Sequence, residues 1–205
     1  MAALGLLGAL GVAAFFALTR ANPLDAAALP DHTADPARGE VLYHAGSCGS
    51  CHKAAEGAPG AEEGLPTGSA PFATPVGIFY PGNLTPDEET GLGRWSEVDF
   101  VNAMVRGVSP DGVHYFPAFP YASYRLMPLE DVLDLRAFLM TLPPVRSPAR
   151  EPDMPAAGLA RRGVGLWKWV GLEEGTFEPD PSRSETWNRG AYLSNGPGHC
   201  GECHT

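Results

Sequence analysis

The sequence predicts an all-α protein in which short helices are joined by long, turn-rich loops. The first observation is a content of 25 Gly and 21 Pro in 205 residues, which is high for a regular helical or sheet protein. The second is a series of segments with helix-capping patterns, with no convincing strand alternation between them. The third is a five-residue motif that occurs twice and contains all four cysteines of the chain.

The repeated motif is Cys-x-x-Cys-His, at residues 48–52 and again at residues 200–204. In the attachment signature of a c-type haem, the two thiols form thioether bonds to the porphyrin and the imidazole becomes the proximal iron ligand. The alternatives are two disulfides, or one zinc site shared by both cysteine pairs, and neither explains why a histidine follows each pair. The sequence therefore predicts two covalent haem c groups, held by Cys48, Cys51, Cys200 and Cys203, with His52 and His204 as iron ligands.

Composition and charge limit the classes of function. The 24 acidic and 14 basic residues give a net charge of -10, which argues against nucleic-acid binding and against electrostatic adhesion of the whole chain to an anionic membrane. The sequence contains no Ser-His-Asp pattern, no Gly-rich phosphate loop and no Rossmann fingerprint. We therefore expect a redox protein without catalytic residues of its own.

The N-terminus is an uninterrupted apolar run from Ala2 to Leu18. As a helix it would measure roughly 26 Å, the short end of what spans a bilayer. The run lacks a basic n-region and a clear cleavage site, which favours an uncleaved transmembrane anchor over a cleaved signal peptide, although Arg20 opposes the positive-inside rule. Residues 1–20 are expected to be this anchor or signal segment, followed by a linker over residues 21–34. Both interpretations place the rest of the chain on the periplasmic side of a bacterial cytoplasmic membrane.

The first folded unit is expected over residues 35–146. Asp35 is an N-cap, and Pro36 occupies the first position of a helix over residues 36–45 that leads into the first haem motif. A long loop over residues 54–94 follows. Its Gly and Pro content predicts an irregular segment that wraps the haem edge.

Two more helices complete this unit. Ser96 and Asp99 form a capping-box pattern that opens a helix ending at Gly107. The last helix is expected over residues 129–142, because Pro143 cannot continue it. The loop between these helices is suited to lining a flat macrocycle, since it carries Tyr115, Phe116, Phe119, Tyr121 and Tyr124.

The order of a helix entering the haem motif, a middle helix and a final helix after a ligand loop is that of a class I cytochrome c domain. The strings TPVGIF at 74–79, NLTPD at 83–87, TGLG at 90–93 and YFPAFPY at 115–121 closely resemble the multi-haem cytochrome c subunits of membrane-bound bacterial alcohol, gluconate and sorbitol dehydrogenases. The resemblance covers residues 37–145 and resumes at Trp187. It implies a subunit that accepts electrons from a periplasmic quinoprotein or flavoprotein dehydrogenase and passes them to the quinone pool or a terminal oxidase.

Met127 is the expected sixth iron ligand in the first domain. It precedes the final helix, where class I domains place their axial methionine, and the resemblance implies a methionine there. A thioether opposite imidazole favours ferrous iron and raises the potential. Met104 is expected to fill the core, and Met140 and Met154 lie too late in the chain for the ligand loop. His114 is expected to be a surface or propionate-contacting loop residue.

An internal repeat indicates a second cytochrome c domain. The segment 38–42 (RGEVL) precedes the first haem motif much as 189–193 (RGAYL) precedes the second. Residues 186–205 are therefore expected to be the truncated start of this second domain, which departs from the complete domains of the family. Residues 147–185 are expected to be a Pro-rich linker. Its amphipathic stretch over 159–172 is expected to pack between domains, or else against a membrane or a partner.

If His52 and Met127 fill both axial positions of the iron, no vacant site is left for substrate or peroxide. We therefore expect an electron carrier. The alternative is a di-haem enzyme such as a cytochrome c peroxidase-like protein. That enzyme needs one haem with an open distal side, which only the second haem could provide. A module that merely tethers or senses is a third hypothesis.

Overall fold

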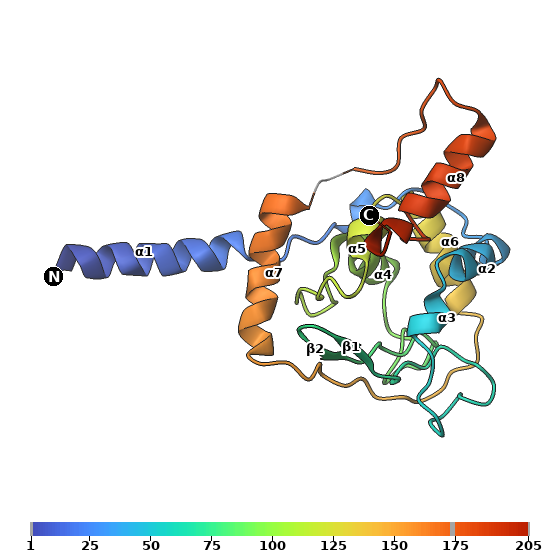
Figure 1. The fold of residues 1–205 in the computed structure, drawn as a ribbon, viewed down its shortest axis with the longest axis horizontal. Coiled ribbons are helices and arrows are strands. Elements are labelled where there is room, and N and C mark those ends of the chain that lie inside the picture. The colour runs from blue at the N-terminus through green and yellow to red at the C-terminus, as the bar shows by residue number, and fades with distance from the viewer. Residues whose placement is uncertain (1, 173–174, 205) are drawn as a thin grey trace.

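A computed structural model describes residues 2–172 and 175–204, and these are mainly helical (Figure 1). The helix α1 (Ala2–Leu18) projects away from a body formed by residues 36–139. The helix α7 (Ala157–Gly171) crosses the base of α1, and α8 (Glu185–Asn195) lies on the far side of the body. The 3₁₀ turn Ala26–Ala28 lies in the segment between α1 and the body.

The body is built on the crossing of α2 (Pro36–Ala45) and α6 (Leu129–Leu139), which make the most extensive helix contact in the described chain. The Asp35 side chain accepts hydrogen bonds from the first backbone amides of α2, so the predicted cap and helix are confirmed. The final helix ends at Leu139, earlier than the predicted residue 142. Apolar side chains from both helices and from the segments between them fill the core, among them Leu42, Phe100, Val101, Met104, Val132, Leu135 and Leu139.

The middle helix begins as predicted. Ser96 accepts from the backbone of Asp99, the Asp99 carboxylate accepts from the backbone of Ser96, and α4 (Glu97–Val101) follows. A π-helical turn then covers Asn102–Arg106 before Gly107 ends the segment with φ 58°. The π-helical turn is a local widening that the capping pattern did not predict. The short helix α5 (Tyr121–Tyr124) precedes α6.

The structure also contains a small antiparallel hairpin, which the all-α prediction did not include. It joins β1 (Phe72–Thr74) to β2 (Gly77–Phe79), with Phe72 opposite Phe79. Strands of three residues are too short to show alternation in the sequence, so the loop prediction missed them. Ile78 also exchanges backbone hydrogen bonds with Asp153, and these bonds attach the linker over residues 147–185 to the hairpin.

The apolar run at the N-terminus forms a helix, α1, with no charged residue. The prediction of a transmembrane span there is not borne out, because in residues 2–172 and 175–204 no helix is both long and apolar enough to cross a bilayer.

Candidate haem sites

The first Cys-x-x-Cys-His motif lies on one tight helical turn. The chain leaves α2 at Ala45 and passes Ser47 in a left-handed conformation (φ 49°) before α3 (Cys48–Cys51) begins. The backbone N–H of His52 donates to the carbonyl of Cys48 over 3.0 Å. Both thiols and the imidazole are therefore presented from the same turn, as thioether attachment with proximal ligation requires.

The imidazole of His52 is held by a residue thirty positions later. Its Nδ1 lies 2.7 Å from the carbonyl oxygen of Gly82, so Nδ1 carries the proton and donates this hydrogen bond. The other ring nitrogen, Nε2, is left with its lone pair for a metal. Burial lowers the pKa of His52, with the Gly82 hydrogen bond opposing that shift, which favours the neutral imidazole that binds iron. The sequence analysis did not identify Gly82.

The four cysteines are neither joined in disulfides nor gathered with other metal ligands in the described part of the chain. Cys48, Cys51, Cys200 and Cys203 are all free. Within the described residues no group of three or more His, Cys, Asp or Glu side chains is placed to hold a metal ion. Burial raises the pKa of Cys48 to about 12, so this cysteine is a neutral thiol at physiological pH.

Met127 lies where the sequence placed it, in the turn before α6. Its side chain is 1% exposed, and its backbone N–H donates to Tyr124 over 2.9 Å. Met104 also lies in the core, as expected for a packing residue. Tyr124 is 6% exposed, and this burial raises its pKa. Tyr124 and Met127 pack in the same core cluster as Leu42 of α2, the helix that leads into the first haem motif.

His114 is not at the surface, which was one of the two positions that the sequence predicted for it. It is 7% exposed, and its Nε2 donates to the carbonyl of Thr19 over 3.1 Å. Its Nδ1 lies 3.2 Å from Nζ of Lys168. These contacts join the end of α1 to α7, so His114 belongs to a packing junction. The sequence offered no sign of this junction, because its members are far apart along the chain.

The second motif repeats the backbone geometry of the first. The helix α8 precedes it as α2 precedes the first, and His199 adopts the left-handed conformation of Ser47, with φ 39°. After the 3₁₀ turn Cys200–Glu202, the N–H of His204 donates to the carbonyl of Cys200 over 3.0 Å. This motif is exposed to solvent, in contrast to the partly buried first motif.

The start of the second repeat packs on α5 and α6 of the first. The rings of Tyr124 and His199 lie 5.7 Å apart edge to face, and Ser123 donates to the carboxylate of Glu202 over 2.8 Å. The buried hydroxyl of Tyr192 in α8 donates to Asp131 in α6 over 2.5 Å. The start of the second repeat is therefore fastened to the body of the first by buried and exposed contacts.

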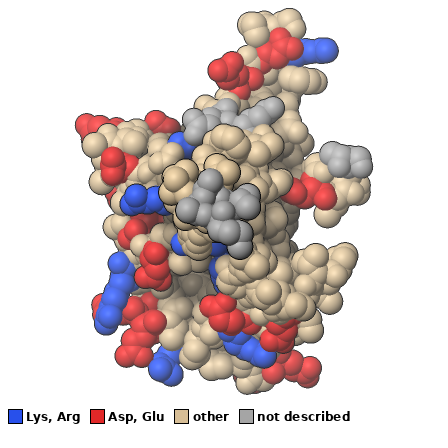
Figure 2. Space-filling model, turned by 90° about the vertical axis from the view of Figure 1, so that its left-hand side faces the viewer, with Lys and Arg blue, Asp and Glu red and all other residues tan. Residues whose placement is uncertain are grey.

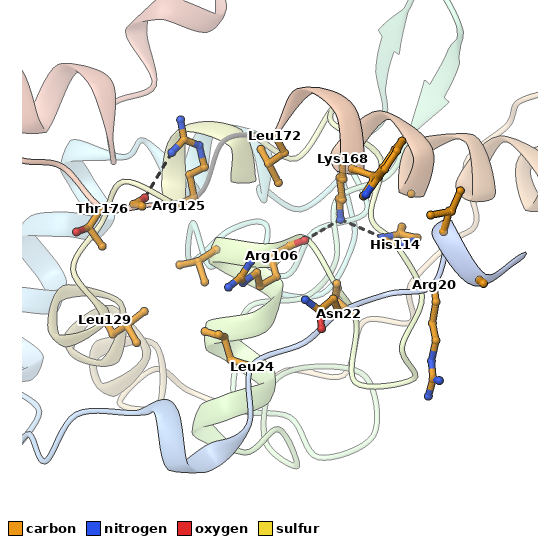
Figure 3. Close-up of a pocket in the computed structure, with 17 residues that line it drawn as sticks. Arg20, Asn22, Leu24, Arg106, His114, Arg125, Leu129, Lys168, Leu172 and Thr176 are labelled. Atoms are coloured by element: carbon orange, nitrogen blue, oxygen red, sulfur yellow. Dashed lines mark hydrogen bonds between the residues drawn. The ribbon is translucent and has the colours of Figure 1, made fainter. Parts of the chain in front are cut away.

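A cavity of about 700 Å³ lies elsewhere, between the end of α1, α7 and the loop after the π-helical turn (Figure 3). It is lined by Arg20, Asn22 and Lys168 among others, and contains no residue of either haem motif.

No family model matches the chain. A nicotinate dehydrogenase subunit of Pseudomonas putida is 43% identical over 168 residues, 82% of this chain and 14% of the relative. A diheme c-type cytochrome of Cereibacter sphaeroides is 38% identical over 193 residues, 92% of this chain and 63% of the relative. The gluconate 2-dehydrogenase cytochrome c subunit of Pantoea cypripedii is 38% identical over 187 residues, 89% of this chain and 41% of the relative. The chain thus spans less than two thirds of the length of each of these relatives.

Proposed function

Because this chain is homologous to the cytochrome c subunits of bacterial dehydrogenases, we propose that it is an electron-transfer subunit that carries electrons through covalent haem c. Its donor is a periplasmic dehydrogenase, and its acceptor is the quinone pool or an oxidase. The relatives favour this role over a di-haem peroxidase, since they are named as cytochromes and dehydrogenase subunits.

The observation that carries the proposal is the orientation of His52. A proximal histidine must present one nitrogen to the iron while the other is fixed by a hydrogen bond. The Gly82 carbonyl fixes Nδ1 at 2.7 Å and leaves Nε2 for this role. When bound, the haem supplies the one-electron Fe(III)/Fe(II) couple, and the protein supplies its ligands and the polarity around it.

We assign the sixth position of the first haem to Met127 within a class I cytochrome c domain. Met127 is buried in the turn before α6, in the same core cluster as Tyr124 and as Leu42 of α2, the helix that leads into the first motif. The long segments over residues 54–94 and 108–127 would then wrap the haem edges. A neutral thioether in an apolar site favours the ferrous state, which suits a carrier that receives electrons from a dehydrogenase.

A second haem is assigned to Cys200, Cys203 and His204. The repeated backbone turn and the diheme relative support two groups. The contact between Tyr124 and His199 packs the residue before the second attachment motif against the loop that carries Met127. Electrons can then pass between the haems within the chain before they leave it.

We further propose that the protein works on the periplasmic side of a bacterial cytoplasmic membrane. The uncharged helix α1 is suited to direct export. Haem attachment to Cys-x-x-Cys-His motifs outside the cytoplasm agrees with that location.

The test is to express the full chain with the bacterial haem-attachment machinery and count the haems per polypeptide as pyridine haemochromes. We expect two in the wild type, one in Cys48→Ala/Cys51→Ala and one in Cys200→Ala/Cys203→Ala. Native membranes are then supplied with nicotinate, gluconate or ethanol, and the substrate that reduces the haem identifies the donor. A high-spin haem that reacts with peroxide would contradict the carrier role.

A further inference from the structure

The helix α7 turns two charged side chains toward the protein and its large apolar side chains outward. On its inner side, Nζ of Lys168 donates to the carbonyl oxygens of Arg106 and Gly107, each over 2.7 Å. Arg161, whose side chain is 21% exposed, donates to the carbonyl of His114 over 3.3 Å. Figure 3 shows Lys168 pointing from α7 toward Arg106 and His114. Two of the three charged side chains of this helix, Arg161 and Lys168, thus face the protein, where apolar ones would be expected in an amphipathic surface helix.

A close backbone contact fixes this orientation. A Cβ atom on Gly165 would lie 2.7 Å from both the Nε2 of His114 and the carbonyl oxygen of Thr19. Gly165 is also the buried residue of α7. Rotating the helix to bury its apolar side would therefore break the contact at Gly165 and the hydrogen bonds of Lys168.

The outer side of α7 is apolar and exposed. Leu159 is 69% exposed, Trp169 65% and Val170 75%, and Leu166 and Trp167 are exposed as well. Positions 159, 166 and 170 recur at helical spacing, so they form one stripe. Several large apolar side chains on one exposed stripe mark a surface that something else covers.

This stripe continues onto α1. The two helices pack against each other, and the guanidinium of Arg162 lies 5.2 Å from the centre of the Phe16 ring. The exposed side chains of α1 are also apolar, including Leu6, Leu7, Leu10, Val12 and Phe16. Figure 2 looks at the side from which α1 projects, and uncharged side chains cover large areas of it.

The charges of this region indicate which kind of surface covers the apolar stripe. The helix α7 carries Arg161, Arg162 and Lys168 and no Asp or Glu, in a chain whose net charge is -10. Arg162, within α7, and Arg20, two residues after the end of α1, are both exposed. Tryptophan rings with a flanking arginine are typical of a helix that lies in the boundary between lipid headgroups and acyl chains.

We propose that the outer face of α7, formed by Leu159, Leu166, Trp167, Trp169 and Val170, lies in the headgroup boundary of an anionic lipid bilayer. Arg162 and Arg20 contact the lipid phosphates, and α1 continues the same apolar face. This contact would hold the haem motifs at a fixed height above the membrane. The inference rests on the proposed location, not on haem binding.

The experiment places a photoreactive benzoylphenylalanine at Val170 in the full haem-loaded chain, in membranes of the expression host. The matched control carries it at Val41, which is 59% exposed on α2, on the opposite side of the body. We expect ultraviolet light to yield phospholipid adducts at position 170 and none at position 41, as detected by mass spectrometry. Protein adducts at position 170 would show a partner chain on this face and would overturn the proposal, as would equal lipid labelling at both positions.

A second measurement tests the role of charge. Flotation with vesicles of phosphatidylcholine plus phosphatidylglycerol is compared with flotation on phosphatidylcholine alone, for the wild type and for Arg162→Ala. We expect the fraction bound to anionic vesicles to fall several-fold in the variant, with the haem spectrum unchanged. An unchanged bound fraction would refute the headgroup contact. If the wild-type protein carried no haem, that result would instead contradict the proposed function.

Discussion

Gly39 of α2 lies directly against the backbone of Asp134 in α6. A Cβ atom on Gly39 would overlap the carbonyl group of Asp134 and come within 2.9 Å of Cβ of Phe138. Only a residue without a side chain lets the two helices cross at this distance. The corresponding glycine of the second repeat, Gly190, has nothing within 4 Å of its Cβ position.

We therefore expect Gly39→Ala to destabilise the protein by about 1–3 kcal/mol, the usual cost of overpacking. Each kcal/mol lowers Tm by about 2–4 °C in a chain of this size. Gly190→Ala is the control, because it gains helix propensity without a clash and should leave Tm unchanged or slightly higher. Thermal unfolding followed by circular dichroism measures both. Equal effects of the two substitutions would show that the helix crossing does not depend on Gly39.

Met127→Ala is expected to abolish the near-infrared methionine-to-iron charge-transfer band of the ferric first haem and to lower its reduction potential, because a thioether is lost. Met104→Ala is the control. It also removes a buried methionine, and should cost about 2–5 kcal/mol of stability while the band remains. Magnetic circular dichroism and a redox titration distinguish the two variants. Retention of the band in Met127→Ala would remove this residue from the ligand set.

Tyr192→Phe tests the contact between the second repeat and the first. The Tyr192 hydroxyl donates to Asp131, which also accepts from Arg38 over 2.8 Å, so the carboxylate keeps one partner in the variant. Loss of a buried hydrogen bond to a charged group costs about 1.5–3 kcal/mol. Tyr80→Phe removes an exposed hydroxyl that donates to Asp153 over 2.7 Å, and should change Tm by less than a degree or two. A Tyr192→Phe protein with the wild-type Tm would show that α8 is not fastened at this point.

Lys168 should give the stability a specific dependence on pH. Burial lowers the pKa of Lys168 to about 7, whereas a lysine in the unfolded chain titrates near about 10.4. Between these values the unfolded chain holds a proton that the folded chain has lost. The free energy of unfolding therefore increases as the pH is raised from about 7 to about 10, and this extra stability is lost when the pH is lowered to about 7.

We expect Lys168→Met to lack this rise, while the exposed Lys53→Met variant keeps it. Tm measured from pH 7 to pH 9.5 in the three proteins gives the comparison. The slope with pH is the readout, because Lys168→Met also leaves the carbonyls of Arg106 and Gly107 without this donor and lowers Tm at every pH. A Lys168→Met profile parallel to the wild type would contradict a depressed pKa at this site.

The elements that the sequence predicted correctly depend on neighbours within a few residues. The helix over residues 36–45 was predicted with its observed bounds, because Asp35 caps it and Pro36 occupies its first position. The capping box of Ser96 and the left-handed stop at Gly107 are local in the same sense. The last helix was predicted too long, since a proline marks only the farthest point that a helix can reach.

The sequence alone indicated the chemistry of this protein. Two motifs with two thiols and an imidazole on one turn predict haem attachment, because the spacing of a few residues fixes the positions of these groups along the backbone. The tertiary structure decided what surrounds them. It brought the Gly82 carbonyl to His52, placed His199 beside Tyr124, and turned Lys168 inward so that Val170 faces outward. These contacts join segments far apart in the chain, so they depend on how the helices pack and not on any local pattern.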